Sequence, residues 1–517
     1  MYEMIEIIAG LIPFLPAFAG FTIPVVYLVS RKRLVVMGYA ALVMTIVAAL
    51  SAIVAVEAYS VDHPLVFKAG GWPAPVGITY IVDRFCAVVG LLTSLIVLAI
   101  MLYSLSYIVD EAYPWYTILL LGNEAGLLGV TYTGDLFNLF VMLEVTGVSS
   151  YALVMYYRRR PISLISGLKY AFIGSLGTSL YLLAMGLTYS FYGTLNLVDF
   201  SYKAISSSEL QVFAYGLILV LASWTFSIKS GVFPNHFWLP DAHPAAPTPI
   251  SALLSGLVVN TGVIGLYKFF YIASWSTTKP PLNTITHLVS LVTITMGALS
   301  GVFGALLMNI QRDIKRLIAY STVMNLGFLF MGVSCLTLKG LQATLYYVIT
   351  HSLAKSTLFL STGVFIKAAE SRNLSDLSGA GMKFKVAGVA FAASTLTLAG
   401  IPPLPGFLAK LLLYEALFEY NVVLAVLMII ASAIGLLAYM KMLYIIVFGT
   451  TVTQLRGVDM KLAQTTLVVL TALIVLVGVV FLFNPDLTQS IVGSAAMQST
   501  VNIEEYIEYV KNTFIQP

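Results

Sequence analysis

The sequence predicts an all-α polytopic membrane protein with about fourteen transmembrane helices. Three observations predict this class. Of the 517 residues, 59% are hydrophobic and only 10% are charged, and apolar runs of about 18 or more residues recur along the whole chain. In soluble domains about a quarter of the residues are charged. A chain with so few charged residues cannot cover a water-facing surface of its size. Lipid must therefore cover much of the protein.

The apolar runs place the predicted spans in order along the chain. They lie at residues 6–30, 34–57, 78–107, 115–133, 136–157, 163–192, 210–230, 248–274, 285–308, 316–336, 341–367, 386–417, 422–449 and 463–484. No basic region precedes the first run, which ends at Arg31, Lys32 and Arg33. That pattern is typical of a first transmembrane helix with a cytoplasmic end, and not of a cleaved signal peptide.

Cationic residues gather in alternate connectors. One set of connectors holds Arg31–Arg33, Arg158–Arg160, the Arg312/Lys315/Arg316 cluster, Lys367–Lys385 and Arg456/Lys461. The other set holds only Lys68, Lys203, Lys279, Lys339 and Lys511. The positive-inside rule places the first set in the cytoplasm, so we expect a multi-pass plasma-membrane protein with both termini outside.

Two segments lie outside the spans. Residues 58–77 alternate in polarity and carry Gly and Pro, which predicts a short outward β-hairpin or an ordered loop. For the tail from Pro485 to Pro517 we expect a short surface helix. The chain shows no soluble domain, phosphate loop, nucleophile elbow or CxxC motif, so it is one membrane domain that carries out no redox or hydrolytic chemistry alone.

Two glutamates are the first candidate functional residues. A charge at the bilayer centre costs at least about 2.5–3.5 kcal/mol, so such residues are paired, hydrated or line a cavity. Glu144 lies nine residues after Asp135, near mid-membrane. The plain alternative is a carboxylate satisfied by hydroxyls such as those of Thr146 or Ser149. Glu124 lies deep in the preceding span and is an accessory candidate.

Two lysines lie next to predicted helix breaks. Lys229 precedes Gly231 and Pro234, and Lys410 follows a stretch with several Gly and Pro residues at 400–406. A helix broken inside the membrane is tolerated where it lines a cavity or is buried in protein. Transporters build ion sites from such pairs of broken helices, although Lys229 as a snorkelling side chain is the alternative. Glu415 and Glu419 mark either an outward exit or a helix end in water.

His351 and Lys355 are four residues apart and therefore share a helix face. A neutral histidine beside a lysine can pass a proton, whereas the alternative is a hydrogen-bonded core pair. Lys268 and Lys441 are accessory candidates for which snorkelling is an equal interpretation.

His236 and His243 flank Asp241 in the first break, which raises the possibility of a metal. The spacing matches no common zinc pattern, so we favour hydrogen bonding by these side chains. We expect no metal site and no cofactor in this chain.

Several long stretches resemble the antiporter-like membrane subunits of respiratory complex I and of Mrp-type Na+/H+ antiporters. They are KSGVFPNHFWLPDAHPAAPTPISALLS (229–255), GDLFNLFVMLEVTGVSSY (134–151), KYAFIGS (169–175), QRDIKRLIAYST (311–322), HSLAKSTLFLSTG (351–363) and AGIPPLPGFLAKLLL (399–413). The resemblance covers about residues 80–450. Details such as GIPPLPGF look closest to the D subunit of Mrp antiporters and to its relatives in archaeal membrane-bound hydrogenase and related ferredoxin-dependent complexes.

The resemblance implies fourteen helices and two inverted five-helix repeats, each with a broken helix. The repeats would span 111–275 and 284–450, after N-terminal helices in 1–110 and before a last helix and tail in 451–517. It also implies an ion-translocation line of Glu144, its partner Lys229, the central His351 and Lys355, and Lys410. One departure is Asn260, where the family commonly has a lysine. An amide cannot carry a proton as a lysine does.

The resemblance implies a proton- or Na+-translocating subunit of a multi-subunit, redox-driven membrane complex, with other membrane subunits and peripheral iron–sulfur subunits as partners. Two alternatives stay open. One is a subunit of a stand-alone Mrp antiporter, and the other is a non-pumping scaffold, which Asn260 favours. No feature indicates nucleic-acid binding.

Overall fold

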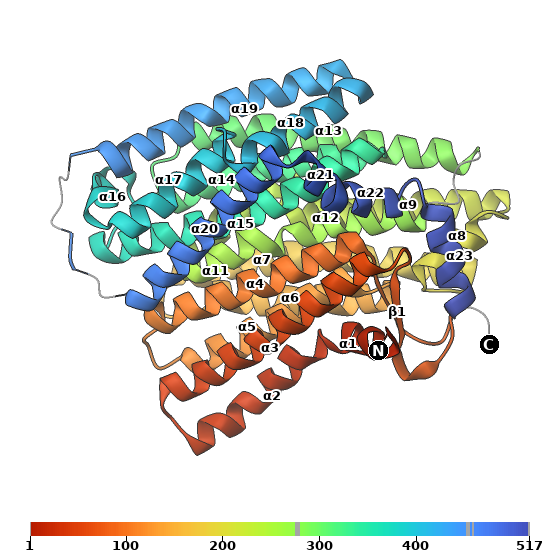
Figure 1. The fold of residues 1–517 in the computed structure, drawn as a ribbon, viewed down its shortest axis with the longest axis horizontal. Helices are drawn as coiled ribbons and strands as arrows, with labels where there is room; N and C mark the ends of the chain where they lie inside the picture. The colour runs from red at the N-terminus through yellow and green to blue at the C-terminus, as the bar shows by residue number, and fades with distance from the viewer. Residues whose placement is uncertain (1, 275–279, 451–454, 458–459, 515–517) are drawn as a thin grey trace.

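Long helices that run roughly side by side form the structure, a computed structural model that describes residues 2–274, 280–450, 455–457 and 460–514 (Figure 1). Both termini lie at one end of the bundle, together with the only strands among the described residues. The connector that holds the short helix α16 (Ala380–Lys383) lies at the opposite end. We call these the terminal end and the α16 end.

The helices follow the apolar runs of the sequence. The first part of the chain forms α1 (Tyr2–Leu11), α2 (Phe14–Val29), α3 (Arg33–Ser60), β1 (Leu65–Lys68), β2 (Thr79–Val82), α4 (Arg84–Tyr107), α5 (Tyr113–Tyr132), α6 (Leu136–Val154), α7 (Pro161–Tyr192), α8 (Leu197–Ala204), α9 (Glu209–Ser230), α10 (Leu239–Ala245), α11 (Thr248–Leu253) and α12 (Asn260–Tyr267). Two π-helical turns, Leu254–Val258 and Lys268–Ala273, flank α12.

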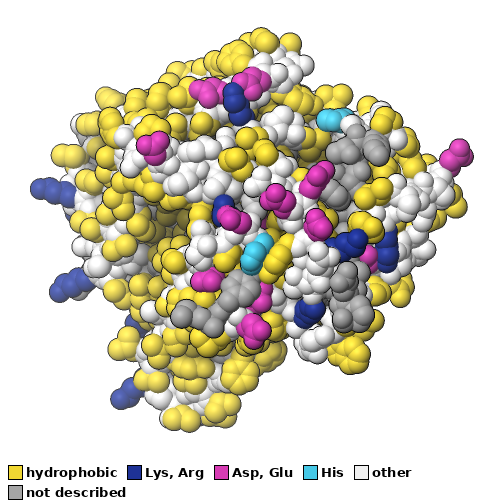
Figure 2. Space-filling model, turned by 45° about the vertical axis from the view of Figure 1, so that its right-hand side comes forward, with side chains coloured by type: hydrophobic (Ala, Val, Ile, Leu, Met, Phe, Trp, Pro, Cys, Tyr) yellow, Lys and Arg dark blue, Asp and Glu magenta, His cyan; other side chains and the backbone are white. Residues whose placement is uncertain are grey.

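The second part begins with α13 (Leu282–Asn309) and continues to the tail. It forms α14 (Ile314–Ser334), α15 (Leu338–Ala369), α17 (Lys385–Ala399), α18 (Pro405–Tyr420), α19 (Val422–Leu443), α20 (Lys461–Phe483), α21 (Pro485–Thr488), α22 (Ser494–Gln498) and α23 (Ile503–Phe514). A π-helical turn, Tyr444–Phe448, extends α19. Figure 2 shows hydrophobic side chains over much of the surface, with acidic, basic and histidine side chains gathered across the middle of the view. Many large hydrophobic side chains of the long helices are exposed, which fits contact with lipid.

The described chain has 10 helices long and apolar enough to cross a membrane, or up to 12 if each of two bent pairs is one span. This confirms an all-α polytopic membrane protein, but not the number fourteen. Helices α5 and α15, of 20 and 32 residues, are long enough but too polar to count. They carry Glu124 and the pair His351 and Lys355, so the candidate functional residues themselves lower the hydropathy.

The two non-span segments form ordered structure at the terminal end. Strands β1 and β2 pair antiparallel, with Leu65 opposite Val82. The predicted segment 58–77 is displaced at both ends. Helix α3 continues to Ser60, and β2 is formed by the first residues assigned to the span 78–107. The tail forms the predicted surface helix as α23, which buries Tyr506 and Val510. Lys279, assigned above to an outer connector, lies outside the described residues.

Two halves of the bundle share one order of elements. Asp135 caps α6 and pairs with Asn196 through an isolated β-bridge; Asp313 caps α14 and pairs with Asn373 in the same way. Each capped helix is followed by a helix of 32 residues, α7 or α15, and then by a broken helix, α9–α10 or α17–α18. This order matches the two predicted repeats, whose exact boundaries stay a prediction.

Candidate functional site

Lys229 lies at the last turn of α9 and is 6% exposed, so it does not snorkel. Its Nζ donates to the Tyr151 hydroxyl at 3.4 Å. Glu144 lies close enough for its charge to act on Lys229, yet within the described residues no ion pair joins the two. Glu144 Oε1 is buried without a hydrogen-bond partner, so neither Thr146 nor Ser149 satisfies it. The structure therefore shows a separated pair.

Tyr151 occupies a fitted space between helices. A Cβ added at Gly174 would lie 1.9 Å from the Tyr151 hydroxyl, so only glycine at this position of α7 leaves room for the phenol. The Tyr151 ring meets the Tyr170 ring edge-on at 4.5 Å, and Tyr170 stacks on Trp238 at 3.9 Å. Trp238 Nε1 donates to the Ile228 carbonyl, next to Lys229. The stack of Tyr151, Tyr170 and Trp238 thus positions both Lys229 and the hydroxyl to which it donates.

Asp241 joins the two halves at the first break. Its carboxylate pairs with Lys169 of α7 at 2.6 Å and with Arg316 of α14 at 3.4 Å. His243 is fully buried and stacks on Phe359 at 5.0 Å, whereas His236 is half-buried and stacks on Phe233. The three side chains therefore have separate surroundings, and the structure does not assemble them as one ligand set.

His351 and Lys355 lie on α15 in the middle of the bundle, and both are 0% exposed. Lys355 Nζ donates to the Ser321 hydroxyl and to the Ile318 carbonyl, at 3.2 Å for the carbonyl. Both ring nitrogens of His351 are buried and lack a partner among the described groups. The pair is therefore not a closed hydrogen-bonded core pair, since the imidazole is free to accept or donate.

Asn260 of α12 contacts α15 beside this central pair. Its Nδ2 donates to the Gly256 carbonyl and to Ser352 Oγ, both at 2.9 Å, and Ser352 follows His351. Asn260 Oδ1 is buried with no hydrogen-bond partner among the described groups. The amide thus occupies the place between the two halves where the family resemblance implies a lysine.

A polar network continues from Lys355 toward Lys410. Asn325, one turn after Ser321 on α14, donates to the Tyr439 hydroxyl at 3.0 Å and accepts from the Tyr347 hydroxyl at 2.6 Å. Tyr439 lies on α19, and two turns earlier on that helix Ser432 accepts from Lys410 Nζ at 2.7 Å. Helix α19 therefore links the central pair to the second break.

Lys410 is 4% exposed and lies next to the break between α17 and α18. Its Nζ donates to the Ala399 carbonyl at 3.1 Å, an acceptor that the end of α17 leaves unused. Gly400 adopts φ +85°, a conformation that favours glycine, and Gly406 packs against the Thr397 carbonyl. The Gly and Pro residues thus create the break that sequence analysis predicts, and the lysine binds its exposed backbone.

The accessory candidates lie apart from this line. Lys441 is exposed and donates to the Asn309 carbonyl at 3.3 Å, which fits a snorkelling side chain. Glu415 is exposed, and the exposed Glu419 pairs with Lys339. Glu124 is 0% exposed, and neither of its carboxylate oxygens has a hydrogen-bond partner in the described chain. Lys268, 3% exposed, belongs to another buried cluster at the terminal end.

Two buried residues were not predicted as site residues. Lys315 counted as part of a cytoplasmic cluster, but it is 3% exposed and donates to the Ala246 carbonyl at 2.8 Å and to Ser251 Oγ at 3.2 Å. It lines a cavity of about 450 Å³ beside the α10–α11 junction. For His243 the sequence favours hydrogen bonding over a metal, but both its ring nitrogens are buried without a hydrogen-bond partner among the described groups. Lys315 and His243 differ from surface residues only in being buried beside the break, and residue spacing in the sequence does not reveal burial.

The fold and the buried charges define a polytopic membrane subunit of the antiporter-like class. Residues 133–435 match the family described as "NADH:quinone oxidoreductase/Mrp antiporter, TM", and the chain belongs to this family. It is 30% identical over 378 residues to the N subunit of an NADH-quinone oxidoreductase from Desulforudis audaxviator, covering 72% of this chain and 73% of that protein. It is 31% identical over 421 residues to the D subunit of an Na(+)/H(+) antiporter from Alkalihalophilus pseudofirmus, covering 80% and 81%.

A solved structure is similar over nearly the whole chain. It is a chain of the membrane-bound sulfane sulfur reductase, an archaeal respiratory membrane complex, with a TM-score of 0.86 and 25% identity over 97% of this chain and 99% of that one. Nearly the whole chain therefore has a counterpart in that fold.

Proposed function

We propose that this chain translocates protons or sodium ions as one subunit of a larger membrane complex, in the plasma membrane with both termini outside. One observation carries the proposal. Three lysines, Lys229, Lys355 and Lys410, are 6%, 0% and 4% exposed, yet none of them has a carboxylate within ion-pair distance in the described chain. Buried uncompensated lysines are costly, and in membranes they mark ion pathways.

The Glu144–Lys229 pair is the coupling element. A lysine held by a carboxylate keeps its proton, whereas a lysine on a neutral hydroxyl releases it more readily. In this structure the Lys229 ammonium lies on Tyr151. A change elsewhere in the complex that alternates the lysine between Glu144 and Tyr151 therefore alters its hold on a proton.

The central and second-break residues complete the path. A proton from the first half reaches the free imidazole of His351 and then Lys355. From there the hydroxyls and amide of Ser321, Asn325 and Tyr439 lead along α14 and α19 toward Lys410. The open backbone of the α17–α18 break gives Lys410 its exit.

The partners follow from the relatives. A subunit of NADH-quinone oxidoreductase and a chain of a respiratory membrane complex are both similar to this chain. We therefore propose other membrane subunits and peripheral iron–sulfur subunits as partners, with no cofactor in this chain. The second candidate is a stand-alone Na+/H+ antiporter complex, favoured by 31% identity to the D subunit of such an antiporter. Purifying the native complex and identifying its subunits distinguishes the two.

The experiment compares ion-gradient formation in vesicles that carry Lys229→Ala, Lys410→Ala and the control Lys441→Ala. We expect the first two to lose the gradient and the control to keep it, because Lys441 is exposed at the surface. A full gradient in either of the first two variants would contradict the proposed function. A non-pumping scaffold would give the same result for all three.

A further inference from the structure

A second buried charged cluster lies at the terminal end, away from the line described above. Its charged members are Asp83, which is 2% exposed, and Lys268, which is 3% exposed. Asp83 precedes α4, and Lys268 begins the π-helical turn after α12. The described residues show no ion pair between them. Burying two charged side chains that do not form an ion pair costs free energy. Such a cluster is therefore a candidate functional site.

The contacts of the two residues meet at Cys86. Lys268 Nζ donates to the Thr133 carbonyl at 2.6 Å and lies 3.9 Å from Cys86 Sγ. Asp83 Oδ1 accepts from the Cys86 backbone N–H at 2.7 Å. The lysine therefore lies near the side chain of Cys86, and the carboxylate binds its backbone N–H.

The other carboxylate oxygen faces the tail. Asp83 Oδ2 accepts from the Tyr267 hydroxyl at 2.8 Å and from the Tyr506 hydroxyl at 3.3 Å. The Tyr267 hydroxyl also lies 2.5 Å from Ser499 Oγ. The cluster thus continues by hydrogen bonds from α12 through Asp83 to α23 and the residues before it.

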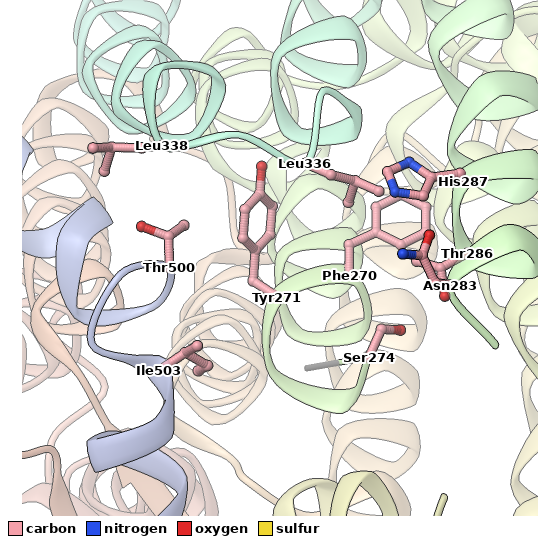
Figure 3. A pocket seen from close by; sticks show the side chains of 10 residues that line it. All are labelled: Phe270, Tyr271, Ser274, Asn283, Thr286, His287, Leu336, Leu338, Thr500 and Ile503. Atoms are coloured by element: carbon pink, nitrogen blue, oxygen red, sulfur yellow. The ribbon is translucent and has the colours of Figure 1, made fainter. Parts of the chain in front are cut away.

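A pocket lies next to the Asp83 cluster. It has a volume of about 280 Å³, and Tyr271, Thr500 and Ile503 line it together with residues of α13 and the α14–α15 connector (Figure 3). Tyr271 stacks on Tyr267 at 6.0 Å, and Thr500 follows Ser499. The pocket therefore adjoins the Asp83 cluster through Tyr271 and Thr500, which are next to Tyr267 and Ser499 without those two residues lining it.

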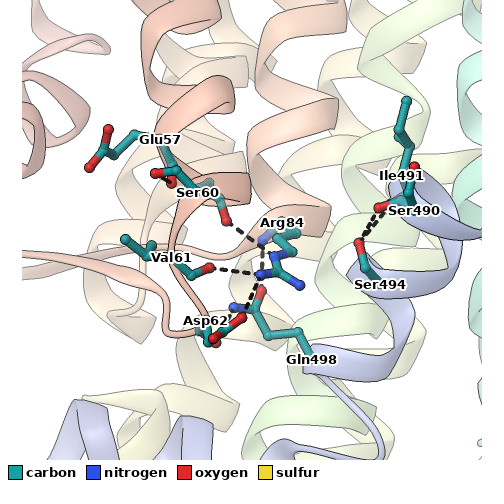
Figure 4. Close-up of polar contacts among 10 residues, drawn as sticks. Glu57, Ser60, Val61, Asp62, Arg84, Ser490, Ile491, Ser494 and Gln498 are labelled. Atoms are coloured by element: carbon teal, nitrogen blue, oxygen red, sulfur yellow. Dashed lines mark hydrogen bonds and ion pairs between the residues drawn. The ribbon is translucent and has the colours of Figure 1, made fainter. Parts of the chain in front are cut away.

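A second polar network joins Arg84, the residue after Asp83, to the molecular surface. Arg84 donates to the Val61 carbonyl at 2.8 Å and pairs with Asp62 at 3.2 Å (Figure 4). Gln498 accepts from the Arg84 N–H at 2.9 Å and donates to the Asp62 carbonyl at 3.1 Å. The Asp62 side chain is fully exposed, so this network reaches the molecular surface one residue from the buried carboxylate.

One helix connects the cluster to the central line. Asn260 and Lys268 are eight residues apart on α12 and its following turn, which is about two turns and about 12 Å along the axis. Asn260 lies two residues after one π-helical turn and Lys268 begins another, and such turns are frequent at functional sites. Helix α12 thus begins at Asn260, which bonds to Ser352 beside the central pair, and is followed directly by Lys268.

We propose that Lys268 and Asp83 form a second proton port, through which the first half of the bundle exchanges protons with the terminal end. The port rests on the proposed function, because it serves the same central line. In this step the Lys268 side chain leaves the Thr133 carbonyl and reaches the Asp83 carboxylate. The N–H bond at Nζ breaks as a carboxylate oxygen takes the proton, and Asp83 then releases it toward the surface. Lys268 regains its charge with the next proton that arrives from the centre.

A purely structural role needs no titratable group. The Thr133 carbonyl requires only a donor, and the hydroxyls of Tyr267 and Tyr506 require only an acceptor. Amides supply both. The variant Lys268→Gln therefore keeps a donor for the Thr133 carbonyl. Asp83→Asn keeps one acceptor oxygen, for example for the Cys86 N–H, and its amide N–H group can donate to tyrosine hydroxyls that turn to accept. Both variants remove the ability to pass a proton.

The test measures proton transport in vesicles that hold the intact complex with Asp83→Asn, Lys268→Gln, Asp83→Glu or the control Asp199→Asn. Asp199 is equally buried, 5% exposed, and pairs with Lys203 outside the cluster. We expect at least a five-fold loss with Asp83→Asn and Lys268→Gln, recovery of at least half the rate with Asp83→Glu, and no change with Asp199→Asn.

A wild-type rate with Asp83→Asn or Lys268→Gln overturns the port, and so does a loss with Asp83→Asn that Asp83→Glu fails to recover. Lys410→Ala in the same vesicles separates the two proposals. If that variant loses transport while Lys268→Gln keeps it, the port alone is wrong. If Lys410→Ala transports fully, the proposed function is wrong.

Discussion

The Lys229 ammonium lies 3.4 Å from the Tyr151 hydroxyl, while Glu144, seven residues before Tyr151 on the same helix, holds a buried oxygen without a partner among the described groups. Residues at this spacing lie on one face of α6 about two turns apart. The helix therefore offers the lysine two positions, a charged one and a neutral one. The balance between them sets how firmly Lys229 holds a proton.

Removing the Tyr151 hydroxyl tests this balance. With Tyr151→Phe we expect about a ten-fold lower rate of ion transport, because the separated position loses its acceptor. A hydrogen bond to a charged group contributes about 1.5–3 kcal/mol, and a contact as long as 3.4 Å belongs at the lower end. Each 1.4 kcal/mol changes an equilibrium about ten-fold. Ion uptake into vesicles measures the rate.

The matched control is Tyr181→Phe, which removes a buried hydroxyl that donates to the Leu136 carbonyl at 3.3 Å. This variant loses a hydrogen bond that does not involve Lys229 and is expected to transport normally. Equal losses in both variants would show that the Tyr151 effect is a general packing defect.

Gly174 offers an independent way to displace the same phenol. In Gly174→Ala the new methyl group would lie 1.9 Å from the Tyr151 hydroxyl, so the ring must move. We expect transport to fall as far as in Tyr151→Phe, and the double variant to be no slower than the single ones, because the contact with Lys229 is already lost. Multiplied losses in the double variant would contradict a shared cause.

Sequence patterns predicted the helices and both breaks because length, hydropathy and the Gly and Pro residues determine them locally. They also predicted that Lys229, Lys355 and Lys410 are buried. They did not reveal Tyr151, since a tyrosine near the end of an apolar helix is indistinguishable from other core aromatics. Lys315 has the spacing of a cytoplasmic basic cluster, and only the fold places it under the α10–α11 junction at 3% exposure.

Asn260 is the place to test how the two halves communicate. Asn260→Ala removes the hydrogen bond to Ser352 Oγ, and we expect transport to fall about five-fold, in line with about 1 kcal/mol for a neutral hydrogen bond. Asn260→Lys restores a proton carrier at this position and is expected to transport at least as fast as the natural chain. Proton uptake by the Ala variant at the natural rate would remove Asn260 from the path.

Asp241 tests the ion pairs between the two halves. These groups are 30–47% exposed, so solvent screens them and each pair contributes about 0–1 kcal/mol. With Asp241→Asn we therefore expect a small change in thermal stability but a clear loss of transport, because α10 loses its tie to α14. Glu370→Gln, in an exposed pair with Arg456, is the control and should change neither quantity. If Asp241→Asn also lowers the melting temperature strongly, the loss of transport reflects misfolding instead.

Gly406 tests the second break by packing alone. A Cβ added there would lie 1.6 Å from the Thr397 carbonyl oxygen, and neither backbone can retreat without opening the contact between α17 and α18. We expect Gly406→Ala to destabilise the fold by about 1–3 kcal/mol or more, as overpacking does. Gly186→Ala is the control, because nothing lies within 4 Å of its added methyl and alanine favours helix. Thermal unfolding of the purified protein should separate the two variants, and a normal melting temperature for Gly406→Ala would mean that the break is wider than the structure shows.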